Sequence, residues 1–221
     1  MNNIKTFENF NNQYIFKYIL NNDIKSVKNY INSKNDLNKQ KNDGDTPLIM
    51  ATYNNIEIVK LLLNAGADIN KQNNAGNTAL ILAASNNRIE IVKLLLNAGA
   101  DIDKQNNSGY TALIYASNNV EIIKLLLDAG ADIDKQNKYG YTALTLAALY
   151  NYHEIVELLL DYGADEFILD NNDKSFYYLL NTENKEYFTQ NYPTSVYNAI
   201  SHNYKKSFIE FVKDFGIKIK K

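Results

Sequence analysis

The 221-residue chain contains no cysteine and only two histidines, His153 and His202. Without cysteine there is no disulfide framework, no thiolate zinc site and no cysteine nucleophile. The two histidines are far apart in sequence, so they do not predict a metal site. No Ser/His/Asp grouping and no glycine-rich phosphate loop occurs. We therefore expect no catalytic residue, no metal and no cofactor, and a reducing, intracellular compartment fits the lack of cysteine.

Charge and hydropathy exclude two further classes of partner. Lysine and arginine total 23 against 25 aspartates and glutamates, a net charge of −2, so we expect no nucleic acid partner. No apolar run approaches the roughly 18 residues of a membrane span. The N-terminus also lacks the apolar segment of a secretory signal. We expect a cytoplasmic protein, in the host cytoplasm if its source is a virus or an intracellular bacterium.

A repeat is the most informative feature of the sequence. Segments of the form Gly-x-Thr-Pro/Ala-Leu recur at nearly constant spacing and place threonines at Thr46, Thr78, Thr111 and Thr142. A second motif, Gly-Ala-Asp, recurs with the same spacing at Gly66, Gly99, Gly130 and Gly163. Two motifs that share a period of roughly 33 residues indicate a stack of small structural repeats.

Each repeat is expected to form two helices and a loop. The threonine hydroxyl caps a short first helix that is rich in small residues, and Pro47 fits its first position. An amphipathic second helix follows and ends at the glycine, which takes a left-handed conformation. The polar run after it predicts an extended, hairpin-like loop. One repeat cannot bury its apolar faces alone, so neighbours must stack into an all-α solenoid.

These motifs resemble the ankyrin-repeat family, down to Ile-Glu-Ile-Val-Lys-Leu-Leu-Leu-Asn-Ala-Gly-Ala-Asp-Ile in the second half of a repeat. The resemblance implies helix-turn-helix repeats joined by β-hairpin-like loops, over residues 43–74, 75–107, 108–138 and 139–171. The family's histidine after the leucine is replaced by Ile49, Ile81, Ile114 and Thr145, so its usual hydrogen bonds to the loop are not expected. The first and third of these repeats are shorter between threonine and glycine than the other two, which predicts a tighter turn at Asn54-Asn55 and at Asn118-Asn119.

The ends of the solenoid are predicted to be degenerate. Residues 1–12 are expected to be frayed, and residues 13–42 form an N-terminal capping repeat with its second helix over 23–31. Residues 172–221 are expected to form degenerate ankyrin-like helices. Within them, the stretch 181–193 is expected to be too short for a full second helix.

Several recurring polar residues are interpreted as structural. Glutamates at one repeat position, each followed three residues later by Lys or Glu, indicate a solvated helix face. The aspartate after each capping glycine is expected to bond local backbone N–H groups. Lys-Gln pairs predict a polar ladder along the loops. These residues are Glu57, Glu90, Glu121 and Glu154; Asp68, Asp101, Asp132 and Asp165; and Gln40, Gln72, Gln105 and Gln136.

The resemblance also implies a binding surface, because ankyrin proteins usually bind partners along a concave side formed by loop tips and first helices. The residues at these repeat positions are Tyr53, Asn54, Asn77, Ser85, Asn86, Tyr110, Tyr115, Tyr139, Tyr141 and Tyr150. Exposed tyrosines are favoured at interface centres, although composition alone is an alternative explanation in a chain with 17 of them. Tyr110 and Tyr141 hold equivalent positions and are expected to lie side by side.

The sequence thus predicts a monomeric, non-enzymatic scaffold that binds another protein on its concave ankyrin surface. An alternative is an adaptor whose C-terminal segment recruits other machinery such as a ubiquitin ligase, as in ankyrin proteins of some large DNA viruses. Only Tyr192-Pro193-Thr194 and the residues after it resemble such a segment. An ankyrin-fused enzyme would need a catalytic domain for which no length remains.

Overall fold

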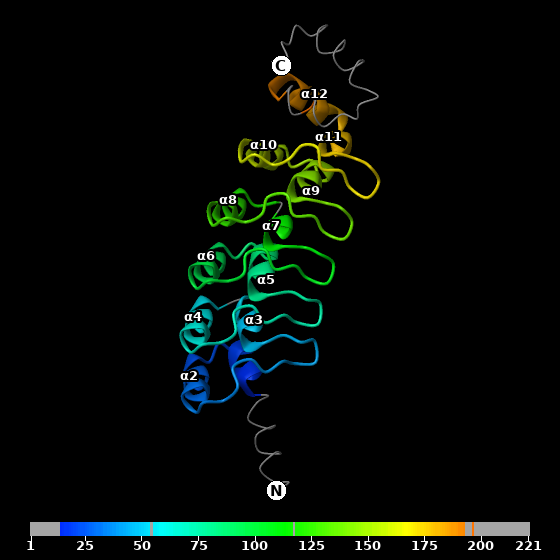
Figure 1. Cartoon of the computed structure of the whole chain (residues 1–221). Coiled ribbons are helices and arrows are strands. Elements are labelled where there is room, and N and C mark those ends of the chain that lie inside the picture. The colour runs from blue at the N-terminus through cyan, green and yellow to red at the C-terminus, as the bar shows by residue number, and fades with distance from the viewer. Residues whose placement is uncertain (1–13, 54, 117, 193–195, 197–221) are drawn as a thin grey trace. The chain divides into compact units, whose positions relative to one another are not determined.

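The computed structural model describes residues 14–53, 55–116, 118–192 and 196. Every regular element in these residues is a helix, so the all-α prediction is confirmed (Figure 1). The chain consists of two units, and each is described by itself. Unit 1 comprises residues 1–112 and unit 2 comprises residues 113–221.

Unit 1 is built from stacked helix pairs. Its elements are a helix over residues 14–20 and the helices α2 (Ile24–Asn32), α3 (Pro47–Ala51), α4 (Ile56–Asn64), α5 (Ala79–Ser85) and α6 (Ile89–Asn97). The short helix after each repeat threonine is the inner helix, and the nine-residue helix after it is the outer helix. Outer helices pack on outer helices (α2 on α4, α4 on α6), and the inner helix α3 packs on α5. The unit therefore has an outer column, an inner column and a column of loops (Figure 1).

Unit 2 repeats this arrangement. Its helices are α8 (Val120–Asp128), α9 (Ala143–Leu149), α10 (His153–Asp161), α11 (Phe176–Leu179) and α12 (Thr182–Asn191), and α7 (Ala112–Tyr115) lies across the boundary between the units. Outer helices α8 and α10 pack together, as do inner helices α9 and α11. Both units thus follow one plan, which the period of the sequence predicts.

Side-chain caps decide where the inner helices begin. The hydroxyl oxygens of Thr46, Thr78 and Thr142 accept hydrogen bonds of 3.1–3.2 Å from the backbone N–H three residues later. Pro47 occupies the first helical position, where its missing N–H costs nothing. The predicted role of these three threonines is confirmed. After each of the outer helices α4, α6, α8 and α10, the glycine of the Gly-Ala-Asp motif has a positive φ, as expected beyond a helix C-terminus.

The two shortened repeats differ from the others in the inner helix and not in the turn. α3 has five residues and α7 has four, whereas α5 and α9 have seven. The link over residues 52–55 is no shorter than the link over 86–88, so the predicted tighter turn is wrong. The residues that these two repeats lack are missing from the inner helix, because the link between the two helices still needs enough residues to reverse the direction of the chain. Asn55 then caps α4, since its Oδ1 accepts from the Ile58 N–H at 2.8 Å.

The core consists of inner helices and one face of each outer helix. In α9 every residue from Ala143 to Ala148 is buried, and alanines allow the close approach of neighbouring helices. The outer helices α4, α6, α8 and α10 each bury three apolar side chains at positions i, i+1 and i+4, which share one face. In α4 these are Ile58, Val59 and Leu62. Burial of this face against the adjacent repeat is the main stabilising interaction.

The loops are hairpin-like, although their described residues contain no strand. In the first loop the Lys41 N–H donates to the Asp45 carbonyl, and the Gly44 N–H donates to the Lys41 carbonyl. The Gln40 amide donates to the Gly44 carbonyl and also to the Gln72 carbonyl of the following loop, at 2.7 Å. Gln72 repeats both contacts one loop later, and Gln136 repeats them in unit 2. The ladder predicted from the Lys-Gln pairs is therefore carried by glutamine and main-chain carbonyls.

The C-terminal part of unit 2 corrects one expectation. The stretch 181–193 is expected from the sequence to be too short for a full outer helix, but α12 has ten residues. Room for it comes from α11, which has only four residues, and from a minimal link in which Asn181 directly caps α12. The Tyr187 hydroxyl of α12 donates to the Glu157 carboxylate of α10, and this bond raises the pKa of Tyr187 to about 12. α12 therefore packs as an outer helix. The residues beyond it, apart from Tyr192 and Val196, lie outside the described part of the chain.

Leu126→Ala is expected to lower the free energy of unfolding by about 2–5 kcal/mol, because this fully buried side chain of α8 would leave a cavity. Repeats contact only their neighbours, so hydrogen exchange should accelerate within residues 108–171 before it does in the first two full repeats. Leu127→Ala, on the same helix but half-buried, is the control and should cost less. Uniform acceleration along the whole chain would contradict this repeat-by-repeat stability.

Candidate functional site

The structure places the predicted site residues at the ends of inner helices and on loops. Among the tyrosines of this set, Tyr139 and Tyr150 are the most exposed, with 55% and 60% of their surface accessible, and Tyr53 follows with 37%. Asn86 is exposed as well. The others are half-buried, which is less exposure than predicted: Asn77, Ser85, Tyr110, Tyr115 and Tyr141. Asn54 lies outside the described residues.

Two pairs of tyrosines flank α9 in unit 2. The rings of Tyr139 and Tyr141 are 6.5 Å apart before the helix, and those of Tyr150 and Tyr152 are 6.0 Å apart after it. α9 has seven residues, which corresponds to about 10 Å of helix. One repeat therefore carries aromatic side chains at both ends of its inner helix. The expected neighbour relation of Tyr110 and Tyr141 stays a prediction, because these residues belong to different units.

A buried asparagine holds the first tyrosine pair. Asn137 Oδ1 accepts hydrogen bonds from the backbone N–H groups of Tyr139 and Tyr141, at 2.9 and 3.0 Å. Among the described residues its Nδ2 has no hydrogen-bond partner, although the atom is buried. The equivalent amides of unit 1 are paired: Asn73 donates to Asp45, and Asn106 donates to the side chain of Asn77.

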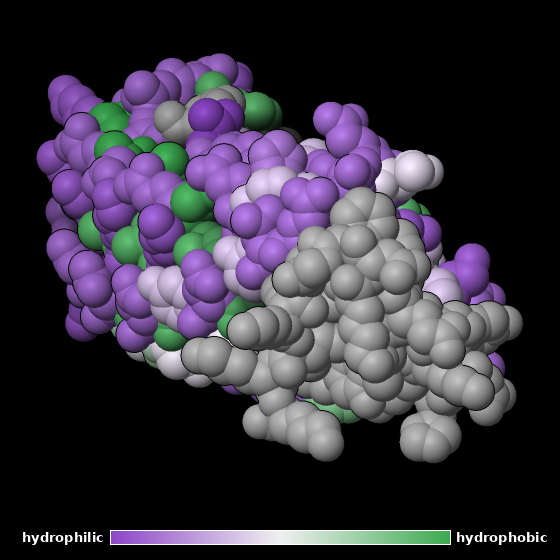
Figure 2. Space-filling model, turned by 90° about the horizontal axis from the view of Figure 1, so that it is seen from above, coloured by the Kyte–Doolittle hydropathy of each residue, from purple (hydrophilic) through white to green (hydrophobic). Residues whose placement is uncertain are grey.

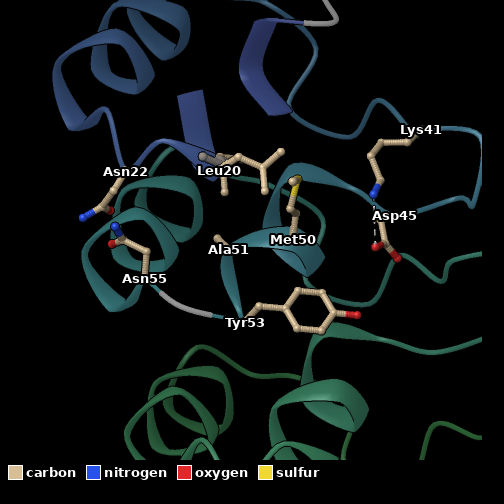
Figure 3. A pocket seen from close by; sticks show the side chains of 9 residues that line it. Leu20, Asn22, Lys41, Asp45, Met50, Ala51, Tyr53 and Asn55 are labelled. Carbon is tan, nitrogen blue, oxygen red and sulfur yellow. Dashed lines mark ion pairs between the residues drawn. The ribbon is translucent and has the colours of Figure 1, made fainter. Parts of the chain in front are cut away.

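A hollow of about 520 Å³ lies in unit 1, beside the end of the helix over 14–20. Figure 3 shows Leu20, Met50 and the Tyr53 ring around its middle, Lys41 and Asp45 at one edge, and two asparagine amides at the opposite edge. The lining residues are Ile19, Leu20, Asn22, Lys41, Asp45, Met50, Ala51, Tyr53 and Asn55. Of these, sequence reasoning singled out only Tyr53 as a site residue. Repeat position could have found Met50, because it lies four residues after Thr46, as the predicted site residue Tyr115 lies four residues after Thr111.

Lys41, at the edge of the hollow, lies closer to one aspartate than to the other. Lys41 Nζ lies 2.8 Å from Asp43 Oδ2 and 3.7 Å from Asp45 Oδ2. The hydrogen bond with Asp43 raises the pKa of Lys41 and lowers that of Asp43, so both groups stay charged. Burial, followed by the charge of Asp45, raises the pKa of Tyr53, so its phenol stays protonated.

The other recurring carboxylates serve the fold. The aspartates after the capping glycines accept from the backbone N–H two residues later, as predicted: Asp68, Asp101, Asp132 and Asp165. Glu90 pairs with Lys93 at 3.0 Å, and Glu57 pairs with Lys28 on the neighbouring helix. No group of three or more His, Cys, Asp or Glu side chains in the described residues could hold a metal ion. Among the helices described, none is long and apolar enough to cross a membrane.

Hydrophobic residues reach the surface only in places. On the face that Figure 2 shows, hydrophilic side chains predominate and hydrophobic ones lie between them in separate patches. The aromatic pairs and the hollow are two places on the described surface that can offer apolar contact to a partner, and Phe167 and Leu169 form a further exposed apolar site on a loop.

Comparison with protein families gives one result. The family described as "Ankyrin repeats (3 copies)" matches residues 15–106 and 98–170. The comparison with curated proteins gives no match. The matched residues include both the hollow and the two tyrosine pairs.

Asn137→Asp is expected to stabilise unit 2 at neutral pH by about 1 kcal/mol, because it removes a buried N–H donor that has no acceptor. The substitution keeps an acceptor for the backbone of Tyr139 and Tyr141. The next repeat already has an aspartate at this position, Asp170, which accepts from two backbone N–H groups. Urea denaturation measures the change.

The control is Asn73→Asp, because the Asn73 amide donates to the Asp45 carboxylate at 2.9 Å and the substitution places two carboxylates together. This variant should be destabilised. Equal effects of both substitutions would show that the unpaired amide of Asn137 has no energetic cost.

Proposed function

Because the chain belongs to the ankyrin-repeat family, we propose that it is a non-enzymatic scaffold that binds a partner protein through exposed side chains of its inner helices and loops. Ankyrin repeats are protein-binding scaffolds in general. The finer proposal is that the tyrosine pairs flanking α9 form the centre of the contact surface. It is also proposed that the protein acts as a monomer inside the cell.

A comparison between repeats carries this proposal. Repeat 75–107 has the same spacing as repeat 139–171, and its residues at the positions of the four tyrosines are polar or small. Tyr139, Tyr141, Tyr150 and Tyr152 correspond to Ala75, Asn77, Asn86 and Arg88. The fold does not require an aromatic residue at any of these positions. Tyrosine also buries a large area at a small cost in side-chain entropy, which suits an interface.

Tyr139→Ala combined with Tyr150→Asn is expected to weaken partner binding by about a thousandfold if the two losses add, because aromatic side chains at an interface centre contribute about 2 kcal/mol or more each. Both new residues occur at the same positions of repeat 75–107, so the melting temperature should remain nearly unchanged. The partner is first isolated by pull-down with the full chain, and its affinity is then measured by calorimetry.

Tyr162→Ala is the matched control. Tyr162 is an exposed tyrosine of the same repeat, but it follows the outer helix, and the repeats before it have alanine there. It should retain wild-type affinity. If the variant at α9 binds as tightly as the wild type, the tyrosines are a feature of composition and the proposed surface is wrong.

The adaptor alternative assigns the recruiting role to residues 172–221, and of these, residues 193–195 and 197–221 lie outside the described part of the chain. It stays a prediction. A pull-down that compares the full chain with residues 1–192 keeps α11 and α12 in place and tests it. Loss of a second set of captured proteins, with the first retained, would support an adaptor.

A further inference from the structure

The hollow of unit 1 exposes apolar surface that no part of the described chain covers. Leu20 has 73% of its surface accessible, although it follows directly on the buried Ile19. Met50 and the Tyr53 ring continue this surface on α3 and at its end (Figure 3). A single exposed leucine is common on proteins, but here it borders a concave volume of about 520 Å³. Such a volume is within the usual range of ligand pockets.

Lys41 and Asp45 line one edge of this hollow, and Asp43 pairs with Lys41 beside it. Lys41 Nζ lies 2.8 Å from Asp43 Oδ2 but 3.7 Å from Asp45 Oδ2, so its ion pair with Asp45 is the longer and weaker one. Asp45 is 7% exposed, and its Oδ1 already accepts from the Asn73 amide at 2.9 Å. Its Oδ2 therefore has a single, long contact among the residues described. The repeat-equivalent residue Asn77 is neutral, so this negative charge is particular to the first full repeat.

We propose that this hollow binds an arginine side chain of the partner protein, together with an apolar residue adjacent to it in the partner's sequence. This inference rests on the proposed scaffold function and names a second contact surface, in unit 1, with its chemistry. The arginine guanidinium lies between Asp45 and the Tyr53 ring, and the apolar residue packs on Leu20 and Met50.

Arginine fits these groups better than other side chains. Its planar guanidinium pairs with a carboxylate, stacks on an aromatic face and is weakly hydrated, so it enters a partly buried site at a smaller cost than lysine. Its aliphatic stem can pack on Met50 while the charged end reaches Asp45. An acidic side chain would be repelled by Asp45, because Lys41 is held at 2.8 Å by Asp43 and lies 3.7 Å from Asp45.

The opposite edge offers groups for the partner's main chain. Asn55 uses its Oδ1 to cap α4, so its Nδ2 is left as a donor, and Figure 3 shows this amide beside that of Asn22. A peptide carbonyl between the arginine and the apolar residue can accept from this donor. The hollow is thus amide-lined at one edge, apolar in the middle and acidic at the other edge.

The test uses Met50 as a reporter, since the chain has only two methionines, Met1 and Met50. Full-length protein labelled with ¹³C at the methionine methyl groups is titrated with acetyl-Leu-Arg-amide and observed by NMR. Met50→Leu identifies the signal. The Met50 methyl is expected to shift and saturate with the arginine peptide. Peptides with citrulline or glutamate in place of arginine should bind at least about tenfold more weakly, and the lysine peptide should fall between them.

Asp45→Asn is the decisive variant. Asparagine occupies this position in the next repeat and accepts from Asn106 there, so the fold and the bond from Asn73 should be retained. The variant should lose about tenfold in affinity for the arginine peptide and little for the citrulline peptide. Asp68→Asn removes the same charge elsewhere in unit 1 and should bind like the wild type.

Three results would overturn the proposal: a Met50 signal that no arginine peptide moves, equal affinity for the arginine and glutamate peptides, or unchanged binding by Asp45→Asn. A Met50 shift that depends on protein concentration without peptide would instead assign the hollow to a second copy of the chain. If the scaffold captures its partner through the tyrosines of α9 while Met50 stays unmoved, the proposed function stands and only the arginine site is wrong.

Discussion

Each helix pair of this protein depends on the next pair to bury its apolar face. A short inner helix and a nine-residue outer helix cannot enclose a core, so the buried side chains of one repeat meet those of its neighbour. This requirement explains why the inner helices are almost entirely apolar or small and why the motifs recur at nearly constant spacing. It also leaves loop tips and helix ends free to vary, and these are the positions at which the repeats differ most.

Close approach of the loops adds a second constraint. A Cβ atom on Gly44 would lie 2.4 Å from the Asn74 backbone nitrogen of the next loop, and φ at this glycine is +82°. Only glycine fits there, and the glutamine side chains then connect successive loops through main-chain carbonyls. The recurring glutamines of the loops could be mistaken for a binding surface, but their side chains stabilise the fold by connecting successive loops. The residues that remain for a partner are those that neither the core nor this ladder employs.

The two candidate surfaces differ in chemistry because they use different repeat positions. Around α9 the surface is aromatic, and its tyrosines take the places of alanine, asparagine and arginine in repeat 75–107. In unit 1 the hollow combines an exposed leucine with a buried aspartate. Mutually different surfaces on one repeated scaffold are a simple way to recognise a partner at more than one point, since substitutions outside the core leave the stacking intact.

The sequence by itself determined the fold, because the repeat period and the threonine, proline and glycine positions reflect local rules of capping and helix termination. It also identified the exposed tyrosines Tyr139 and Tyr150, since repeat position predicts exposure. Tertiary structure alone decided the rest. The two shorter repeats have shorter inner helices, α3 and α7, and not shorter turns. The inner helix α11 has only four residues, which leaves room for α12. In both cases packing sets where a helix ends. The hollow joins Leu20, Asp45 and Tyr53 from separate segments, and no local pattern in the sequence reports a distance between them.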